Sequence, residues 1–316
     1  MLMDLGMPLI ALLVVVGVLL DLVFGEARRW HPLVGFGNLA SSLERRLNKT
    51  DRSIASGALA WLLAVLPPVL AAIWLIRTAA LYGFWIVALL HVLLLYFSIG
   101  LRSLRDHLLP IATALVSHDL SLARELTARI VSRDTADASS SDLAKAGVES
   151  LLENGNDAVF ATLFWFIIAG GPGALLFRLA NTLDAMWGYR TPRYLRFGRV
   201  AARIDDGLNW LPARLTALSY AALGNTGNAL WCWRAQAPAW SSPNAGPVMA
   251  AGAGALGLAL GGAARYDGVI ESRPALGRGE PAADRDIVRA WHLVLGTCVL
   301  WTGAIGLAGF LIWLKG

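Results

Sequence analysis

Five long apolar stretches divide this 316-residue sequence and constrain its fold more than any other feature. They are residues 9–24, 54–76, 79–101, 158–177 and 291–314. A helix needs roughly 20 mostly apolar residues to cross a bilayer. Only 16% of the residues are charged, against about 25% in an ordinary soluble domain. We therefore expect an all-α fold, a polytopic integral membrane protein with about five transmembrane helices and helical polar segments between them.

Two apolar stretches raise questions about the number of spans. Residues 247–264 are a sixth candidate, but this stretch is short and rich in Gly and Ala, which suits close helix packing better than lipid contact. Residues 158–177 are interrupted by Ala169-Gly170-Gly171-Pro172-Gly173. A true span and a re-entrant hairpin are both open there, since such a break is tolerated where protein or a water-filled cavity lines it. A hairpin would keep the arginine-rich segments on both sides of it in the cytoplasm, as basic residues favour.

We expect residues 1–316 to form a single membrane-embedded domain, with polar functional segments at 102–157 and 181–246. The sequence shows no strand-like alternation. Pro110, Ser117-His118-Asp119 and the Ser139–Asp142 cluster should break the first segment into helices, and the last of these is a helix N-cap signal. Thr191-Pro192 predicts another helix start, with Pro at the first helical position.

Three carboxylates lie at the end of the first polar segment. Glu149, Glu153 and Asp157 are spaced four residues apart, so they share one face of a helix. A solvated surface stripe is one interpretation. A functional site is the other, because the stripe leads into an apolar stretch, where carboxylates are expensive and usually functional. Mg²⁺ would relieve their mutual repulsion, since carboxylate and amide oxygens are its usual ligands.

Charged residues elsewhere extend this pattern. The turn at Arg133-Asp134 is either a loop ion pair of little value or an anion clamp. Asn181 and Asp184 are three residues apart and can point at one site. An arginine stripe on one helical face would bind either lipid headgroups or a phosphate-bearing ligand. The stripe consists of Arg193, Arg196, Arg199 and Arg203, and the polar residues Asp205, Asp206 and Asn209 follow it.

Other function classes find no support in the sequence. No Gly-x-Ser-x-Gly, Walker-type or His-Glu-x-x-His motif is present, which disfavours a standard hydrolase, P-loop ATPase or zincin. The two cysteines are too few for a disulfide framework or a thiolate metal cluster. We expect no nucleic-acid partner, because no soluble basic domain stands apart from the apolar stretches.

A series of short blocks resembles the adenosylcobinamide-phosphate synthase family of cobalamin biosynthesis. The blocks follow the family's order along nearly the whole chain. They include Arg133-Asp134-Thr135, Val148-Glu149-Ser150, Glu153-Asn154, Asn181-Thr182-Leu183-Asp184, Gly188-Tyr189-Arg190, Asp205-Asp206, Asn209-Trp210, Ser242-Pro243-Asn244-Ala245-Gly246 and Tyr266-Asp267-Gly268. One departure follows the Asn-Ala-Gly block, where the family typically has Trp-Pro-Glu and this chain has Pro247-Val248-Met249.

The resemblance implies a multi-pass ligase of the bacterial inner membrane with cytoplasmic polar segments. It would join (R)-1-aminopropan-2-ol, usually as its O-phosphate, to the propionate of adenosylcobyric acid, using ATP and Mg²⁺. The implied partners are these two substrates, membrane lipid and other late cobamide-assembly membrane enzymes. Two alternatives stay open: another membrane transferase using a metal-bound phosphate substrate, and a non-catalytic membrane regulator or transporter of the same fold.

Joined to the resemblance, the polar clusters suggest roles for individual residues within a single site. The expected catalytic residues are Glu149, Glu153, Asp157 and Asp184. The expected substrate- or phosphate-binding residues are Arg133, Asp134, Asn154, Asn181, Arg190, Arg193, Arg199 and Asn209. The expected Mg²⁺ ligands are Glu153, Asp157, Asp205 and Asp206.

Overall fold

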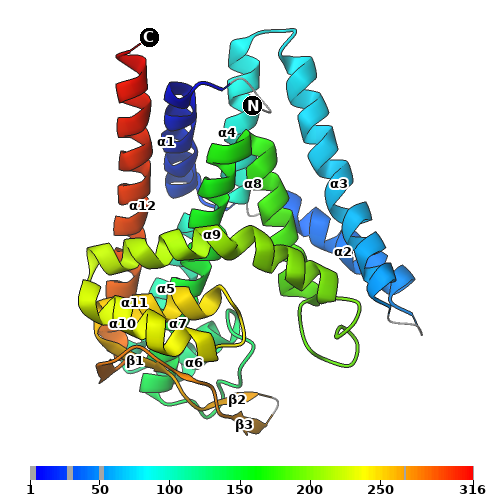
Figure 1. Ribbon diagram of the computed structural model, residues 1–316. Coiled ribbons are helices and arrows are strands. Elements are labelled where there is room, and N and C mark those ends of the chain that lie inside the picture. Colours follow the sequence, from blue (N-terminus) through cyan, green and yellow to red (C-terminus); the bar gives the residue numbers. More distant parts are fainter. Residues whose placement is uncertain (1–4, 27–30, 50–52, 267, 316) are drawn as a thin grey trace. The chain divides into compact units, whose positions relative to one another are not determined.

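The computed structural model describes residues 5–26, 31–49, 53–266 and 268–315 (Figure 1). The chain divides into two compact units. Unit 1 consists of Met1–Gly100, Ala161–Asn209 and Thr302–Gly316, and unit 2 of Leu101–Phe160 and Trp210–Trp301. Our expectation of a single membrane-embedded domain stays a prediction.

Helices dominate both units, which confirms the all-α class. The helices that lie wholly in unit 1 are α1 (Met7–Phe24), α2 (Pro32–Leu47), α3 (Ile54–Ala79), α4 (Phe84–Ser98) and α8 (Ala161–Trp187). Unit 2 holds α5 (Leu101–Val116), α6 (Leu120–Ala128), α7 (Ser140–Gly155), α10 (Thr226–Gln236) and α11 (Ala245–Leu256). Residues of both units belong to α9 (Arg199–Leu223) and α12 (Asp284–Trp313).

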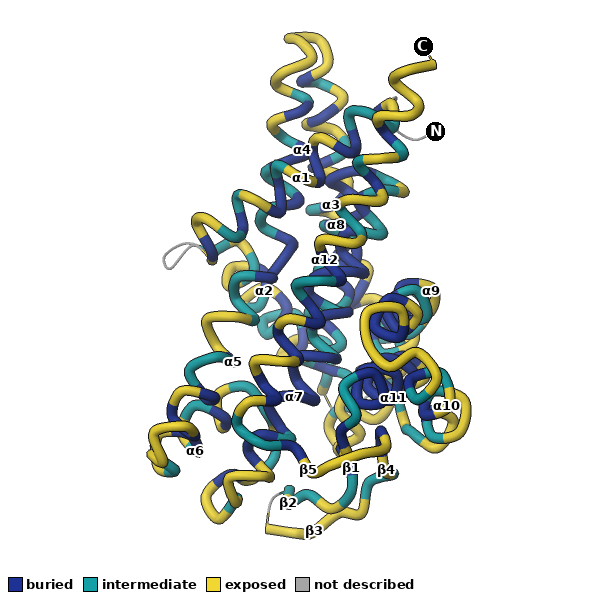
Figure 2. The backbone as a smooth tube through the Cα atoms, turned by 90° about the vertical axis from the view of Figure 1, so that its left-hand side faces the viewer, coloured by how far each residue is buried: buried dark blue, intermediate teal, exposed yellow. Residues whose placement is uncertain are grey.

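Five helical segments among the described residues are long and apolar enough to cross a membrane, as the sequence predicts. They are Met7–Phe24, Ile54–Ala79, Phe84–Val116, Ser140–Trp187 and Asp284–Trp313. Many of their large apolar side chains are exposed, including Leu70, Trp74 and Leu89. Exposed stretches, drawn in yellow, recur along these helices in Figure 2. Outward-facing apolar side chains are what lipid contact requires, so the fold is that of a polytopic membrane protein.

The sixth apolar stretch is not a span. Its helix, α11, has 12 residues, roughly 18 Å of helix, and ends at Gly257, whose φ of 68° is left-handed. The small residues serve close packing instead. A Cβ on Gly252 would lie 2.6 Å from the Leu152 side chain of α7, and one on Gly254 2.8 Å from the Cα of Ala229 in α10.

The Gly/Pro break in α8 reverses the chain within unit 1 (Figure 1). Ala169 and Gly170 leave the helical conformation, and Gly170 has a φ of 63°. A Cβ on Gly173 would lie 2.3 Å from the carbonyl oxygen of Trp165, whereas residues eight apart in a continuous helix are about 12 Å apart. The backbone N–H of Gly171 donates to buried His91 Nδ1 in α4 at 2.8 Å. The chain therefore forms a helical hairpin at this break, while its re-entrant position in the membrane and the shared side of its flanking segments stay predictions.

Local signals predicted some helix ends and missed others. Ser139 and Asp142 form a capping box at the start of α7, as expected. His118, with a φ of 58°, separates α5 from α6. Pro110, however, does not end α5, because packing of α5 against α6 and α7 maintains the helix. The predicted helix start at Thr191-Pro192 is also wrong, since residues 192–198 form turns and α9 begins at Arg199.

Short strands in unit 2 were not predicted from the sequence. One sheet has the order β4-β1-β5, formed by Ala275–Leu276, Leu258–Gly261 and Glu280–Pro281. In it β1 pairs antiparallel with β4, with Leu260 opposite Leu276, and parallel with β5. The hairpin of β2 (Ala264–Tyr266) and β3 (Val269–Glu271) pairs Arg265 with Ile270. These strands place the segment 258–281 close to α7.

Candidate functional site

A polar cavity of about 520 Å³ lies within unit 2. Its volume falls in the range of small-molecule sites, roughly 300–1,000 Å³. One wall is a face of α7, with Glu149, Ser150, Glu153 and Asn154. The other walls come from the 130–133 loop, the 239–241 segment with Met249, and residues 271–274 with Tyr266. The blocks around Arg133 and Glu149 that were separate in sequence therefore meet at one cavity.

Glu149 is the most heavily bonded side chain of this cavity. It is buried, at 3% exposed. Its Oε2 accepts from Arg133 Nη2 at 2.5 Å and from Arg273 Nη1 at 3.0 Å. Its Oε1 accepts from the Gly261 backbone N–H at 2.8 Å and from Arg273 Nη2 at 3.3 Å. An ionised carboxylate has about four acceptor sites, so these four donors favour a positioning role for Glu149 over the predicted catalytic one.

Arg273 is a cavity residue that the sequence analysis missed. Its guanidinium group lies 5.6 Å from the centre of the Trp240 ring, and its Nε donates to the Gly262 carbonyl at 3.2 Å. The side chains of Arg133 and Arg273 are only 12% and 14% exposed. Arg273 lies 124 residues after Glu149, in a segment with no periodic pattern. Its isolation in the sequence left no signal by which to find it.

Glu153 lies one helical turn after Glu149 and lines the same cavity. Within the part of the chain that the structure describes, its carboxylate has neither a hydrogen-bond nor an ion-pair partner. The neighbouring Asn154 uses its Nδ2 to donate to the carbonyl and hydroxyl oxygens of Ser150, both at 3.0 Å. Because a carbonyl oxygen only accepts, this contact fixes which way the amide points. The Glu153 carboxylate and the Asn154 amide oxygen are therefore two adjacent oxygen ligands at the cavity.

Asp157 differs from the other two carboxylates of the predicted stripe. A π-helical turn, Asn156–Phe160, begins one residue before it, and such turns often mark functional sites. Asp157 Oδ1 accepts from Asn156 Nδ2 at 2.9 Å, and Asn156 Oδ1 accepts from the Thr216 hydroxyl at 2.9 Å. Asp157 is not part of the cavity lining. Its predicted catalytic and metal roles stay predictions.

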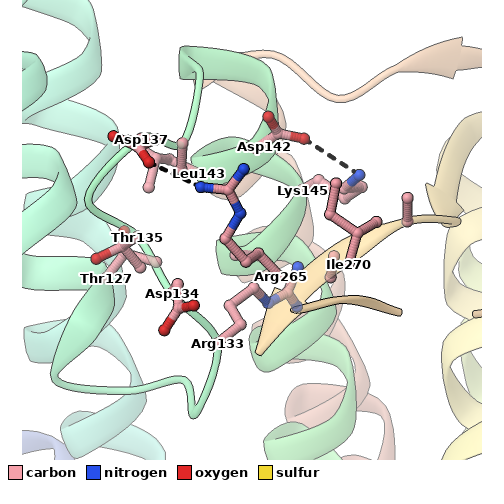
Figure 3. Close-up of a pocket in the computed structure, with 14 residues that line it drawn as sticks. Thr127, Arg133, Asp134, Thr135, Asp137, Asp142, Leu143, Lys145, Arg265 and Ile270 are labelled. Carbon is pink, nitrogen blue, oxygen red and sulfur yellow. Dashed lines mark hydrogen bonds and ion pairs between the residues drawn. The ribbon is translucent and has the colours of Figure 1, made fainter. Parts of the chain in front are cut away.

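A second pocket of about 280 Å³ shares Arg133 with the first (Figure 3). The charged side chains there are largely paired with one another, as Arg265 with Asp137 at 2.8 Å and Lys145 with Asp142 at 3.3 Å. Asp134 Oδ2 accepts from the Gly268 backbone N–H at 2.7 Å, and its own N–H donates to the Arg265 carbonyl at 2.9 Å. These contacts attach the Arg133 loop to the β2–β3 hairpin. Asp267, in the middle of the resembling block there, lies outside the described residues.

The remaining predicted site residues lie between Asn181 and Asn209 and belong to unit 1. The rest of the second polar segment, residues 210–246, belongs to unit 2. Asn181 Nδ2 donates to Asp205 Oδ1 at 3.3 Å, so these two do lie together. Gly188 lies against Asp184, because a Cβ there would lie 2.7 Å from the Asp184 carbonyl oxygen and would also meet its side chain. Burial raises the pKa of Asp206, although the nearby arginines Arg203 and Arg190 oppose that rise. Asn209 is buried at 2% exposed.

The predicted arginine stripe is wrong as a helical feature. Arg193 and Arg196 precede α9 and lie in turns, so only Arg199 and Arg203 are on the helix. Arg193 forms two bonds with Glu44 of α2, from Nε to Oε1 at 2.9 Å and from Nη2 to Oε2 at 2.7 Å. This pair disfavours Arg193 as a phosphate ligand, while Arg199 is exposed. The phosphate roles of both stay predictions.

A preformed metal cluster is not seen among the residues that the structure describes: no three His, Cys, Asp or Glu side chains group closely enough to hold an ion. Mg²⁺ is usually held by one or two carboxylates together with substrate phosphates and water. Glu153 with the Asn154 amide oxygen fits that simpler requirement. Asp205 and Asp206 belong to unit 1, and their predicted metal role stays a prediction.

Comparison with known proteins identifies relatives over nearly the whole chain. The sequence model of the CobD/Cbib protein family matches residues 14–294. A relative from Stutzerimonas stutzeri named cobalamin biosynthesis protein CobD is 54% identical over 300 residues, 94% of this chain and 97% of the relative. Relatives of the same name from Chromobacterium violaceum and Mycobacterium tuberculosis are 51% identical over 96% of this chain and 97% of the relative, and 36% over 95% of each. No solved structure matches. This chain, with its membrane-type helices and its polar cavity, therefore belongs to the CobD/CbiB family of cobalamin biosynthesis.

Proposed function

We propose that this protein is the membrane ligase that forms the amide bond between (R)-1-aminopropan-2-ol O-phosphate and the propionate of adenosylcobyric acid, using ATP and Mg²⁺. One observation carries the proposal. A carboxylate without a partner among the described residues, Glu153, lies in one cavity with two arginines that Glu149 holds in place. The names of the relatives support the pathway.

The reaction needs an activated carboxylate and a neutral amine. The propionate oxygen attacks the γ-phosphorus of ATP and ADP leaves, which converts the propionate into an acyl phosphate. The amine nitrogen then attacks the acyl carbon, the carbon–oxygen bond to the phosphate breaks, and inorganic phosphate leaves. Glu153 accepts the proton that the ammonium group must lose, a role suited to a carboxylate within reach of the amine.

Arginine and metal would hold the charged groups of the substrates in these steps. Arg133 and Arg273 present N–H donors at fixed positions, suited to binding phosphate oxygens of the amine substrate. Mg²⁺, held by ATP phosphate oxygens and the Asn154 amide oxygen, would neutralise phosphate charge and would leave the Glu153 carboxylate to the amine. Met249 lines the same cavity at the position where the resembling family has Glu. The carboxylates available to this chain there are those of α7 and of exposed Glu271.

A direct assay tests the proposed reaction. Membranes that contain the protein are incubated with adenosylcobyric acid, aminopropanol phosphate, ATP and Mg²⁺, and the amidated corrinoid is detected by mass spectrometry. We expect product formation that needs each component and one ADP per amide. Absence of product with both the phosphorylated and the free amine would overturn the ligase.

The proposal also includes the location of the reaction, at the cytoplasmic face of the bacterial inner membrane. The hairpin in α8 supports a shared side for the polar segments before and after it. Single cysteines placed at exposed Ser132 and at exposed Arg199 should both react with a membrane-impermeant maleimide only after the inner membrane is opened. Labelling of one site but not the other in closed vesicles would contradict both the shared side and the single-site prediction.

A further inference from the structure

Apart from exposed Glu271, the charged side chains of the polar cavity fall into two groups, called here its two ends. Arg133 and Arg273 form one end, where two guanidinium groups share the single carboxylate of Glu149. At the other end is Glu153, which has no hydrogen-bond or ion-pair partner among the described residues and also lines the cavity. One end therefore has an excess of positive charge, and the other a carboxylate that needs a cation.

The two arginines form a rigid donor set. Glu149 binds both, the Gly262 carbonyl fixes the Nε of Arg273, and the Trp240 ring lies over its guanidinium group. Each guanidinium group has five N–H donors. Arg133 uses one of them on Glu149, whereas Arg273 uses two on Glu149, one on the Gly262 carbonyl and one on the Gly261 carbonyl at 3.5 Å, so most of the remaining donors belong to Arg133. Phosphate is an anion that paired guanidinium groups match well. Because these side chains are already held in place, they lose little conformational freedom when a phosphate binds. Preorganisation lowers the cost of binding in this way.

The distance between the two ends limits the size of the ligand. Glu149 and Glu153 are four residues apart on α7, so their Cβ atoms lie roughly 5–6 Å apart. An amino alcohol phosphate separates its phosphorus from its nitrogen by only an ester oxygen and two carbons, so its two charges can reach groups held on neighbouring turns of α7. A free anion would be repelled by Glu153, and a free amine would leave the arginines unused. A small molecule with both charges satisfies both ends.

We infer that this cavity binds the phosphorylated amine as a zwitterion, with its phosphate on Arg133 and Arg273 and its ammonium group at Glu153. Glu149 then acts as a positioning residue, and the amine nitrogen lies beside the group that removes its proton. The inference rests on the proposed function for the identity of the amine. The remaining volume of the cavity, about 520 Å³ in all, leaves space beside the nitrogen for the propionate end of the larger substrate.

Direct binding to the full chain in detergent tests this inference without turnover. The probes are aminopropanol phosphate, free aminopropanol and ATP, each titrated by calorimetry in the absence of corrinoid. We expect Arg273→Gln to weaken the binding of aminopropanol phosphate at least about tenfold, equivalent to about 1.4 kcal/mol. It should leave the weaker binding of free aminopropanol and the binding of ATP unchanged. Arg273→Lys keeps the charge without the fork, and should recover part of the loss.

Arg278 provides the matched control. It is an exposed arginine of the same segment, lies 5.5 Å from the Trp231 ring and is not part of the cavity lining. Arg278→Gln should change none of the three affinities by more than about twofold, well below the tenfold that 1.4 kcal/mol represents. If Arg273→Gln does not fold, the comparison of Arg273→Lys with Arg278→Lys replaces it.

The outcomes separate this inference from the ligase itself. Unchanged binding of aminopropanol phosphate to the Arg273 variants, or a loss confined to ATP, would overturn the zwitterion site. Equal weakening by the Arg278 variants would overturn it too. A wild-type protein that binds aminopropanol phosphate through Arg273 but forms no amide would leave the site standing and remove the proposed function. In an active enzyme, a raised KM for aminopropanol phosphate with little change in kcat supports the assignment.

Discussion

Each unit of the molecule contains a buried glutamate bonded to arginine, and the two arrangements differ in one instructive way. In unit 1, the Glu44 side chain is 5% exposed and Arg193, which is 57% exposed, uses two donors on it. In unit 2, the Glu149 side chain is 4% exposed and is shared by two arginines that are themselves nearly buried. One carboxylate per guanidinium satisfies the charge locally. One carboxylate for two leaves an excess of positive charge, and a cavity lies beside it.

The difference indicates how a structural ion pair can be told from a ligand site. Glu44 joins α2 to the turn before α9, with Asn48 as a further donor at 2.7 Å, and lines no described cavity. Its hydrogen bonds hold two chain segments together, and its arginine partner lines neither of the two cavities described above. Glu149 holds two arginines that line a cavity large enough for a substrate. Residue types alone do not distinguish a structural ion pair from a ligand site. The number of arginines per carboxylate and the presence of an adjacent cavity do.

The largest effect should come from Glu153, the cavity carboxylate with no hydrogen-bond or ion-pair partner among the described residues. Glu153→Gln keeps the size of the side chain and removes the proton acceptor, so kcat should fall by about 10²–10⁴-fold, the usual contribution of a general base. The fold should be unaffected. Amide formation is measured alongside thermal unfolding in detergent. Glu271→Gln, an exposed change on the same cavity, should cost far less activity, and an equal loss in both variants would contradict a specific role for Glu153.

Glu149→Gln should instead lower stability. Removing one member of a buried charge pair typically costs about 3–5 kcal/mol, because the partner charges stay buried. Here two guanidinium groups would lose their common acceptor. Thermal and denaturant unfolding of the purified chain should show a much larger fall for Glu149→Gln than for Glu44→Gln. Comparable falls in the two variants would remove the distinction between the sites.

Much of the fold follows from the sequence because hydropathy and turn chemistry act locally. The five apolar stretches, the break at Gly170-Gly171-Pro172 and the Ser139 cap are each read from a few neighbouring residues. The start of α9 was missed because its determinant is not local. Thr191-Pro192 is a sound start signal, but Arg193 is fixed by Glu44, 149 residues away. The strands of segment 258–281 have two to four residues each, too few for any alternation to show.

About half of the candidate site could be predicted from the sequence. The α7 carboxylates were found from their spacing, and Arg133 from the turn before them. Arg273 and Trp240 were missed because only the folded chain brings them to α7. The roles within the set were also beyond the sequence, since Glu149 and Glu153 look equivalent four residues apart. Only the bonds of Glu149 show that one of them is occupied by arginines and the other is not.

A smaller effect is expected for Glu44→Gln. The carboxylate is nearly buried, but Arg193 is more than half exposed and can be solvated by water once its partner is lost, so the pair should contribute modestly. We expect the Tm to fall by at most about 2–4 °C, the shift that a loss of about 1 kcal/mol produces in a chain of about 150–250 residues, and catalysis to be unchanged. A control at Arg129, whose pair with Glu125 is exposed on both sides, should show no measurable change. A clear loss of amide formation in Glu44→Gln would place this pair at a functional site.

The smallest effect is the dependence of that same pair on pH. Burial raises the pKa of Glu44, but the hydrogen bonds from Arg193 and Asn48 outweigh it and lower the pKa below its ordinary value of 4.5. A group whose pKa is lower in the folded state stabilises the fold above its unfolded pKa, and this contribution disappears as the pH falls through the folded pKa. The Tm difference between wild type and Glu44→Gln should therefore be constant near neutral pH and shrink below about 4.5. A difference that persisted unchanged down to the pH of acid unfolding would mean that Glu44 acts through its shape and packing, and not through its charge on Arg193.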